Sequence, residues 1–599
     1  MFVWDKKDLN DDQVRAIEHP GSVFLIACPG SGKTRTLTYK IARLLSELKS
    51  DKKRVVAITY THRAADEIHE RIEQLGVDTS QLWIGTIHSF CLEWILKPYG
   101  IYHPALANGF RVINAHDTER MHDELCGAQQ GIRINSFDCA YYFKPTGYVL
   151  TCRSTAKHAA ITNVLQSYWR ALRDSRQIDF ELILFYAYQL IDKHPSISAL
   201  LGSIFECVLV DEFQDTKEIQ YTIIASILKA SQGCASAFIV GDPNQAIYGS
   251  LGGYAISAKD FERQCDTQFS ELELSDNYRS SARIVTYFGN YNVFPSKVEA
   301  VGPDKDYMSL VSYDQQTHRD ALESELVRLI RYNVETIGIP SHEICIVAPW
   351  WVHLASMTRQ LVAALPDYSF DGPGMVPFAR DIDNFWYKLA RIVLTKASPQ
   401  LYVRRMRWAG EVLAGLSDAG VDIPGLDRKT LLRACNAIVI DEIDGLSFLR
   451  AFFDQLCTAL GIDRQASHSL REHHEAFFES SQKRIDRLTK EGSVAIAEVA
   501  MFRKVFAGRA GITISTIHGV KGAEYDAVIA YGLLEGMVPH FSDPEQIEAA
   551  KKLIYVVSSR ARKNLHLVSE RGRSRGWSGD YQPTDVLVGC RFQYDEVPA

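Results

Sequence analysis

The sequence lacks several features that would assign it to a specialised class of protein. Its twelve cysteines include no C-x-x-C pair, so neither a zinc ribbon nor a thioredoxin-type motif is readable. No apolar run approaches the length that spans a membrane. Residues 1–7 lack the basic-then-apolar layout of a signal peptide. We therefore expect a cytoplasmic protein whose cysteines are mostly small buried side chains.

An excess of positive charge is also missing. The formal net charge of −7 excludes a uniformly basic protein that coats nucleic acid. It leaves room for a local basic channel, because binding depends on where lysines and arginines cluster. The 599 residues are too many for one core and predict roughly three to five domains or subdomains.

What the sequence does contain is a phosphate-binding pattern near its start. Residues 22–27 are typical of a short apolar strand, residues 28–32 of a glycine-rich turn, and the residues from Lys33 onward of a helix. Glycines let backbone N–H groups converge on a phosphate, and the helix N-terminus adds partial positive charge. Lys33 can reach the β- and γ-phosphates, and the Thr34 hydroxyl can hold Mg²⁺. An ordinary strand-to-helix turn is the alternative, which the flanking elements and the later motifs disfavour.

The next segments repeat the strand–turn–helix order. Residues 54–68 and 82–91 each begin with an apolar strand and continue into a polar turn, which predicts a parallel sheet with crossover helices. Hydroxyl, aromatic and imidazole groups at the strand ends suit phosphate contact and base stacking, although each alone is more often turn chemistry. Residues 108–179 show no clear strand alternation and are interpreted as a helical insertion.

Two adjacent carboxylates follow a later apolar strand, at residues 207–210. Ligands of open α/β sheets bind at the carboxyl ends of the strands. Asp211 is placed to reach Mg²⁺, and Glu212 to orient and polarise an attacking water. After a further strand at 237–240, Gln245 is placed to sense a γ-phosphate and Tyr248 to touch a base.

Taken together, these motifs resemble those of the UvrD/Rep/PcrA-type helicases of superfamily 1. The resemblance extends over nearly the whole chain and is carried, in order, by LNDDQ, ACPGSGKTR, ITYTHRAA, GTIHSF, IDFELI, LVDEFQDT, VGDPNQAIY, LSDNYRSS, TISTIHGVKGAEY and LIYVVSSRAR.

The resemblance implies an α/β fold with two RecA-like P-loop NTPase motor domains, each interrupted by a mostly helical insertion subdomain. The first motor domain is expected at 1–107 and 180–275, with its insertion at 108–179. The second is expected at 276–380 and 492–599, with a shortened insertion at 381–491. A fused nuclease or an iron–sulfur cluster is not expected, because no matching ligand or nuclease motif is readable.

For the nucleotide, the resemblance implies ATP and Mg²⁺ as cofactors. Gln13 would recognise adenine, Tyr278 would stack on it and Glu524 would hold the ribose. The phosphates would lie against the loop Ala27, Cys28, Pro29, Gly30, Ser31 and Gly32 and against Lys33, Thr34 and Arg35, with Thr34 and Asp211 holding the metal. Lys33, Asp211, Glu212, Gln245, Arg279 and Arg560 are the implied catalytic residues, both arginines coming from the second motor domain.

For the second ligand, the resemblance implies single-stranded DNA or a duplex with a single-stranded overhang. The positions that would contact it are Thr59, Tyr60, Thr61, Arg63, Thr86, His88, Tyr248, His518 and His540. Related motors usually continue after Tyr248 and Gly249 with a Trp and an Arg, whereas this chain has Ser250 and Leu251. Tyr60, Tyr248 and Tyr254 remain as stacking platforms, so we expect weaker grip on each base.

The resulting hypothesis is an ATP-dependent single-stranded DNA translocase or helicase with three-prime to five-prime polarity, a direction that only the resemblance implies. Three alternatives stay open. The motor could strip or remodel protein–DNA complexes, it could serve a separate nuclease subunit in DNA repair or anti-phage defence, or it could use ATP only as a conformational clamp.

Overall fold

The computed structural model describes residues 8–372, 375–378, 381, 383–490, 495–507, 509–541, 543, 545–576 and 579–598. The chain divides into two compact units. The first unit comprises Met1–Val112, His122–Leu322 and Ile517–Ala599, and the second comprises Ile113–Met121 and Glu323–Thr516.

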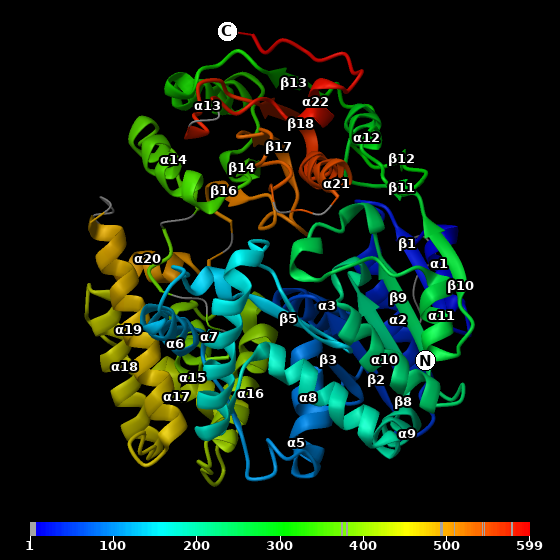
Figure 1. Cartoon of the computed structure of the whole chain (residues 1–599), viewed down its shortest axis with the longest axis vertical. Helices are drawn as coiled ribbons and strands as arrows, with labels where there is room; N and C mark the ends of the chain where they lie inside the picture. Colours follow the sequence, from blue (N-terminus) through cyan, green and yellow to red (C-terminus); the bar gives the residue numbers. More distant parts are fainter. Residues whose placement is uncertain are drawn as a thin grey trace. The chain divides into compact units, whose positions relative to one another are not determined.

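A six-stranded parallel sheet forms the centre of the first unit (Figure 1). Its strand order is β10-β1-β9-β8-β2-β3, with every neighbouring pair parallel. The strands predicted at 22–27, at the start of 54–68 and of 82–91, at 207–210 and at 237–240 all belong to it. The strands are β1 (Val23–Ala27), β2 (Arg54–Thr59), β3 (Leu82–Thr86), β8 (Phe205–Asp211), β9 (Ser236–Gly241) and β10 (Ser270–Leu274).

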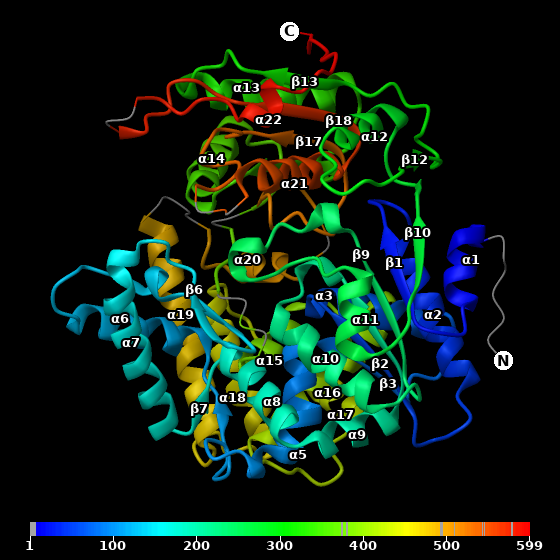
Figure 2. The same ribbon diagram turned by 45° about the vertical axis from the view of Figure 1, so that its right-hand side comes forward.

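Helices cover this sheet because parallel strands need crossover connections. Side chains such as Val23 and Leu25 of β1 share one core with Leu37 of α2 and with Ile68 and Ile72 of α3. Helices α8 to α11 lie together beside the sheet in Figure 2. The helices that accompany this sheet in the sequence are α1 (Asp11–Glu18), α2 (Lys33–Glu47), α3 (His62–Gln74), α4 (Ile87–Phe90), α5 (Lys97–Tyr99), α8 (Phe180–Lys193), α9 (Pro195–Ile204), α10 (Glu218–Ala230) and α11 (Ala258–Cys265).

The first unit contains a second set of parallel strands, in which β18 lies between β13 and β17. Its long strand is β18 (Ala561–Val568), and helix α21 ends just before it. The remaining elements here are β11 (Asp276–Asn277), β12 (Glu299–Ala300), β13 (Val311–Asp314), β17 (Tyr525–Ala530), α12 (Ala282–Gly289), α21 (Gln546–Ser558) and α22 (Asp585–Val588).

The segment predicted as a helical insertion, 108–179, contains two main helices, α6 (Ala115–Ala128) and α7 (Thr155–Asp174). It also contains strands that the sequence pattern did not reveal. The antiparallel hairpin of β5 (Tyr141–Lys144) and β6 (Gly147–Leu150) is aromatic or apolar at most positions and buries only Phe143, so no alternation of polar and apolar residues marks its strands. The short strands β4 (Arg111–Val112) and β7 (Gln177–Ile178) pair in parallel at the two ends of the segment.

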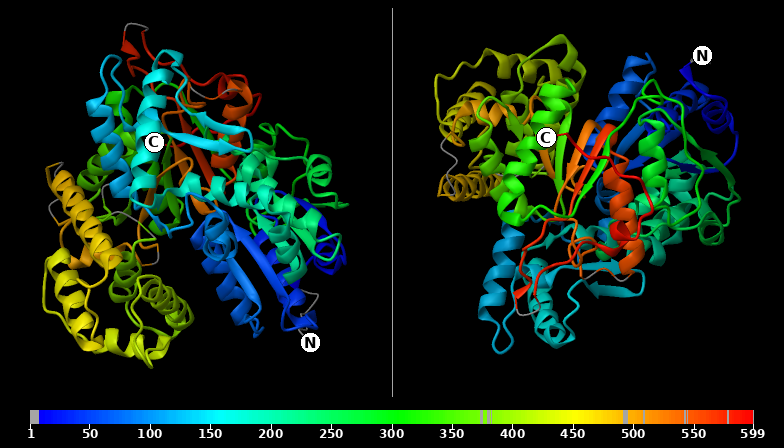
Figure 3. Two further views of the ribbon diagram at one scale, coloured as in Figure 1. Left: turned by 60° about the horizontal axis from the view of Figure 1, so that its bottom comes forward. Right: turned by 90° about the horizontal axis from the view of Figure 1, so that it is seen from above.

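The second unit combines three parallel strands with a helical bundle. Strand β16 (Ile512–Thr516) lies between β14 (Ile344–Ala348) and β15 (Phe370–Asp371). Helices α15 to α19 gather side by side in Figure 3, around an aromatic core that includes Trp386, Phe453 and Phe477. The helices are α13 (Leu322–Arg331), α14 (Trp351–Ala364), α15 (Phe385–Leu394), α16 (Tyr402–Asp418), α17 (Arg428–Ala437), α18 (Gly445–Leu460), α19 (His468–Lys490) and α20 (Val499–Lys504).

The predicted fold class is confirmed: the chain is an α/β protein of the two-motor type with mostly helical insertions. The proposed domain boundaries stay a prediction, and boundary residues 380, 491 and 492 lie outside the described residues. Among the described residues, no helix is both long enough and apolar enough to cross a membrane.

Candidate active site and nucleic-acid interface

The phosphate-binding loop has the geometry that its glycines require. Gly30 and Gly32 adopt positive φ angles of 71° and 76°, and Gly32 precedes the first residue of α2. A Cβ atom on Gly32 would lie 2.6 Å from Nε2 of Gln13, and one on Gly30 would lie 2.7 Å from Cβ of Arg279. Side chains at these positions would therefore disrupt the loop as well as strain its backbone.

The residues of this loop fit a bound triphosphate. The N-terminus of α2 has no side-chain cap, so its N–H groups are directed at the place where an anion would bind. Within the described part of the chain, the buried Ser31 hydroxyl has no hydrogen-bond partner. Ala27 and Cys28 are buried at the base of the loop, and burial raises the pKa of the Cys28 thiol, which therefore stays protonated.

Lys33 and the two carboxylates that follow β8 meet in this structure. The Lys33 ammonium forms an ion pair with Glu212, and its Nζ lies 3.7 Å from Oδ1 of Asp211. Burial raises the pKa of Asp211 to about 6 despite the nearby lysine. Burial would also raise the pKa of Glu212, but attraction to Lys33 and Lys521 outweighs it and holds that pKa at about 2. Glu212 is therefore a carboxylate at neutral pH.

Glu212 is held in an unusual backbone conformation. Its φ of 56° lies in the left-handed region, which a residue with a Cβ adopts rarely and at a cost of about 1–3 kcal/mol. The side chain of Gln214 donates a hydrogen bond to the Glu212 carboxylate and accepts one from the backbone N–H of Asp242 at 3.0 Å. Gln214 thus fixes the orientation of the carboxylate.

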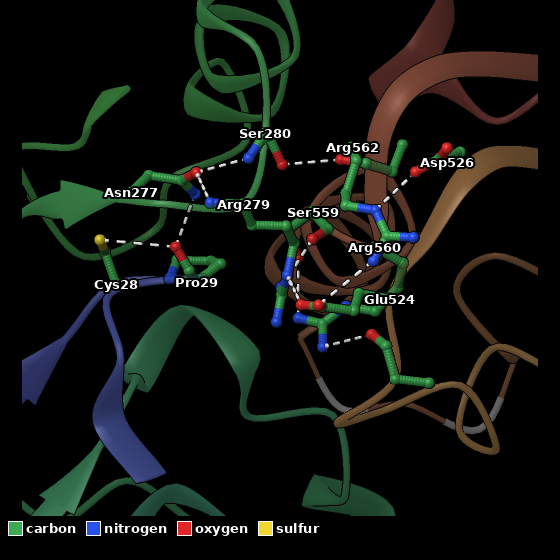
Figure 4. A network of polar contacts seen from close by, with 12 residues as sticks. Cys28, Pro29, Asn277, Arg279, Ser280, Glu524, Asp526, Ser559, Arg560 and Arg562 are labelled. Carbon is green, nitrogen blue, oxygen red and sulfur yellow. Dashed lines mark hydrogen bonds and ion pairs between the residues drawn. The ribbon is translucent and has the colours of Figure 1, made fainter. Parts of the chain in front are cut away.

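Two arginines distant in sequence approach the loop region (Figure 4). Arg279 Nε donates to Oε2 of Glu524 at 2.6 Å, and its Nη1 donates to the Ser559 carbonyl at 2.9 Å. Arg560 is 2% exposed, and its Nη2 donates to Oε1 of Gln245 at 2.9 Å. Burial, together with the charge of Arg279, lowers the pKa of Arg560 to about 9.

Gln245 belongs to a buried polar network that the sequence motifs did not predict. Its Nε2 donates to Oδ2 of Asp242 at 2.8 Å, and the Tyr555 hydroxyl donates to the same oxygen at 3.3 Å. Lys521 Nζ donates to the Gln245 carbonyl at 2.7 Å and to Oδ2 of Asp215 at 2.5 Å. Sequence reasoning named neither Asp242 nor Lys521 as functional, although both lie inside the quoted motifs.

The residues expected to hold the adenosine lie next to the loop. Gln13 is 3% exposed, and its Nε2 donates to the Ser31 carbonyl at 2.9 Å. Tyr278 is 40% exposed, and its backbone N–H donates to the Gly30 carbonyl at 2.9 Å. The Tyr278 ring is therefore tied to the loop yet open on its surface. Glu524 pairs with Arg279, and burial, which would raise the Glu524 pKa, is outweighed by the combined charges of Arg279, Arg562 and Arg560 and the hydrogen bond from Arg279, so that the pKa is lowered.

The predicted DNA contacts fall into two groups. Thr59 and Thr86 are buried and pair in register at the ends of β2 and β3. The hydroxyls of Thr61 and Thr86 accept hydrogen bonds from the first turns of α3 and α4. Thr61 and Thr86 are therefore already engaged as helix caps, whereas the Thr59 hydroxyl donates to the Thr61 carbonyl.

The second group is exposed or partly exposed, and it includes the rings. Tyr60 is 43% exposed, and its ring centroid lies 5.2 Å from that of Tyr248, which lies 5.3 Å from that of His518. Arg63 is exposed at the start of α3. Burial, together with Lys217 and His62, lowers the pKa of His88 to about 3, so this imidazole is neutral at physiological pH. Burial also lowers the pKa of His540.

Comparison with known proteins agrees with this arrangement. Residues 9–266 match the model of the UvrD/REP helicase N-terminal domain, and residues 470–572 match that of the UvrD-like helicase C-terminal domain. The chain is 25% identical to the ATP-dependent DNA helicase PcrA of Leuconostoc citreum, over 94% of this chain and 82% of that protein. It is 22% identical to PcrA of Staphylococcus epidermidis, over 95% and 84%, and 22% identical to PcrA of Staphylococcus aureus, over 94% and 83%.

Proposed function

Because the chain belongs to the UvrD-like helicase family, we propose that it hydrolyses ATP with Mg²⁺ in order to move along single-stranded DNA. The proposed direction is three-prime to five-prime, and the proposed work is duplex unwinding or remodelling. The observation that carries this proposal is the convergence of Lys33, Glu212 and Arg560, which come from three distant parts of the sequence.

In the proposed mechanism, each of these side chains has a distinct task. The loop N–H groups and Lys33 bind the phosphates, and Thr34 with Asp211 would hold Mg²⁺, which screens phosphate charge. Glu212, oriented by Gln214 and held as a carboxylate by the charges of Lys33 and Lys521, accepts a proton from the attacking water once Lys33 has moved to the phosphate. Arg279 and Arg560 stabilise the charge that develops on the transferring phosphoryl group.

Lys33 must leave Glu212 when it binds a phosphate, because one ammonium group cannot pair fully with both. Release of the lysine frees the Glu212 carboxylate for a water molecule. We therefore propose that nucleotide binding activates Glu212. When no nucleotide is bound, the ion pair with Lys33 keeps Glu212 inactive.

The direct test measures ATP hydrolysis with and without single-stranded oligonucleotides, followed by unwinding of duplexes with a three-prime or a five-prime overhang. Stimulation by single strands together with unwinding from the three-prime overhang alone supports the full proposal. Stimulation with unwinding only from the five-prime overhang would overturn the polarity. If single strands did not stimulate ATP hydrolysis at all, the proposal of a DNA-dependent motor would be overturned.

The departure from the family at Ser250 and Leu251 bears on unwinding. Leu251 ends the short 3-10 turn Gly249–Leu251 and is 50% exposed, so its side chain contributes little to a core. Neither side chain offers a broad face to a base, nor a cation to a phosphate. We propose weak unaided strand separation. The alternative of a motor that assists a separate nuclease rests instead on the shortened second insertion that the sequence predicts and on the lack of a readable nuclease motif.

A gain-of-function variant checks this point. Ser250→Trp with Leu251→Arg should tighten single-strand binding about fivefold or more, because one added stack is worth about 1–3 kcal/mol. Unwinding per ATP hydrolysed should rise with it. Oligonucleotide titration and a coupled unwinding assay measure the two effects, with Ser250→Ala as the matched control. A double variant that binds no better than the wild type would make the missing ring irrelevant.

A further inference from the structure

A row of rings crosses the surface of the first unit. The Tyr60 and Tyr248 planes are tilted by 31°, and those of Tyr248 and His518 by 52°. The three residues come from the end of β2, the loop after β9 and the loop after β16, and they meet only in the folded chain. Such a row offers successive faces on which the bases of a single strand can stack.

A second pair of rings lies in the loop that precedes α21. The ring centroids of His540 and Phe541 are 4.1 Å apart, with 37° between their planes. Partial burial lowers the pKa of His518, and the field of His540 contributes to this shift while Asp543 opposes it. Asp543 also acts on His540, as does the exposed Arg153. The charge of Asp543 therefore acts on both His518 and His540.

Phe541 is 63% exposed, although the backbone around it is held in place. Its backbone N–H donates to the Gly536 carbonyl at 3.2 Å, and the His540 N–H donates to Oδ2 of Asp543 at 3.2 Å. The side chain of Gln546 donates to the His540 carbonyl at 3.2 Å. The loop thus presents one face of Phe541 to solvent while His540 supports the ring, an arrangement that preorganises it for stacking.

We propose that Phe541, supported by His540, is a base-stacking platform for single-stranded DNA, additional to the rings of Tyr60 and Tyr248. The ligand is a nucleobase of the same single strand. The positive charge of Arg153, close to His540 and Asp543, suits the adjoining backbone phosphate. The inference rests on the proposed function, since it assigns a further contact to the same strand.

The test compares full-length variants in titrations with labelled single-stranded oligonucleotides of normal sequence and with abasic analogues of equal length. Phe541→Ala should weaken binding to the normal oligonucleotide by about fivefold to a hundredfold. The loss should largely vanish on the abasic analogue, which has phosphates but no bases to stack. Phe541→Trp should restore or improve binding, because it keeps a flat aromatic face.

Ile547→Ala is the matched control, since Ile547 is 68% exposed, lies on nearby α21 and carries no ring. It should bind both oligonucleotides as the wild type does. Equal binding by Phe541→Ala and wild type, or an equal loss on normal and abasic DNA, would overturn the inference while leaving the motor proposal intact. A wild-type protein without affinity for single strands would overturn both.

Discussion

Replacing Glu212 with Gln lowers ATP turnover by about a hundredfold or more, while ATP still binds. This is the usual scale for the loss of a general base. The amide keeps the length of the side chain and its proximity to Gln214, but it cannot accept a proton from water. ATP affinity should not fall, because the substitution removes the carboxylate that competes with phosphate for Lys33.

Phosphate release at saturating single-stranded DNA measures the turnover of this variant, and titration with a fluorescent ATP analogue measures its affinity. Glu271→Gln makes the same chemical change at an exposed position of β10 and should leave both quantities unchanged. Near-normal turnover in Glu212→Gln would show that another group activates the water.

Replacing Arg279 or Arg560 with Ala should lower ATP turnover by about a thousandfold. Arginines that stabilise a transferring phosphoryl group contribute factors of about 10³–10⁵ in related chemistry. Their charge matters most as the γ-phosphoryl group departs, so ATP affinity should change far less than turnover. Arg560 lies in a desolvated position beside Gln245, where such a charge acts strongly.

Arg560→Lys is the more informative substitution, because Arg560→Ala removes the hydrogen bonds that Arg560 donates to Gln245 and to the Val556 and Ala523 carbonyls. The lysine keeps a positive charge but loses the planar fork that contacts Gln245 and the Val556 carbonyl. Thermal unfolding verifies that each variant is folded. Arg283→Ala is the matched control. Arg283 lies four positions after Arg279 in the sequence and forms an ion pair with Asp595. A variant that mainly loses ATP affinity would contradict the proposed role.

Much of the first sheet could be predicted from the sequence, because its strands are short apolar runs bounded by glycine-rich or polar turns. The runs at 22–27 and 207–210 correspond to β1 and β8, and the loop with Lys33 and the Asp211–Glu212 pair follow them directly. Local patterns suffice there, since each functional residue sits at the carboxyl end of a strand that the pattern itself defines.

The side-chain partners could not be predicted in the same way. The ion pair between Arg279 and Glu524 joins residues separated by more than two hundred positions, and no local pattern encodes it. The left-handed conformation of Glu212 depends on its surroundings and not on its residue type. The hairpin of β5 and β6 was missed because it buries few apolar side chains, and alternation is visible only when one face is buried.

Lys521 joins the two ligand sites through a single ammonium group. Its Nζ donates to the Gln245 carbonyl and to Asp215, and it lies 5.4 Å from the centre of the Tyr248 ring. A base that shifts Tyr248 would therefore perturb the same cation that supports Gln245, the proposed sensor of the γ-phosphate. Thermodynamic reciprocity then applies: whatever factor DNA applies to the affinity for ATP, ATP must apply to the affinity for DNA. Measuring either factor fixes the other, and the same factor limits how far ATP binding alone can loosen or tighten the hold on the strand.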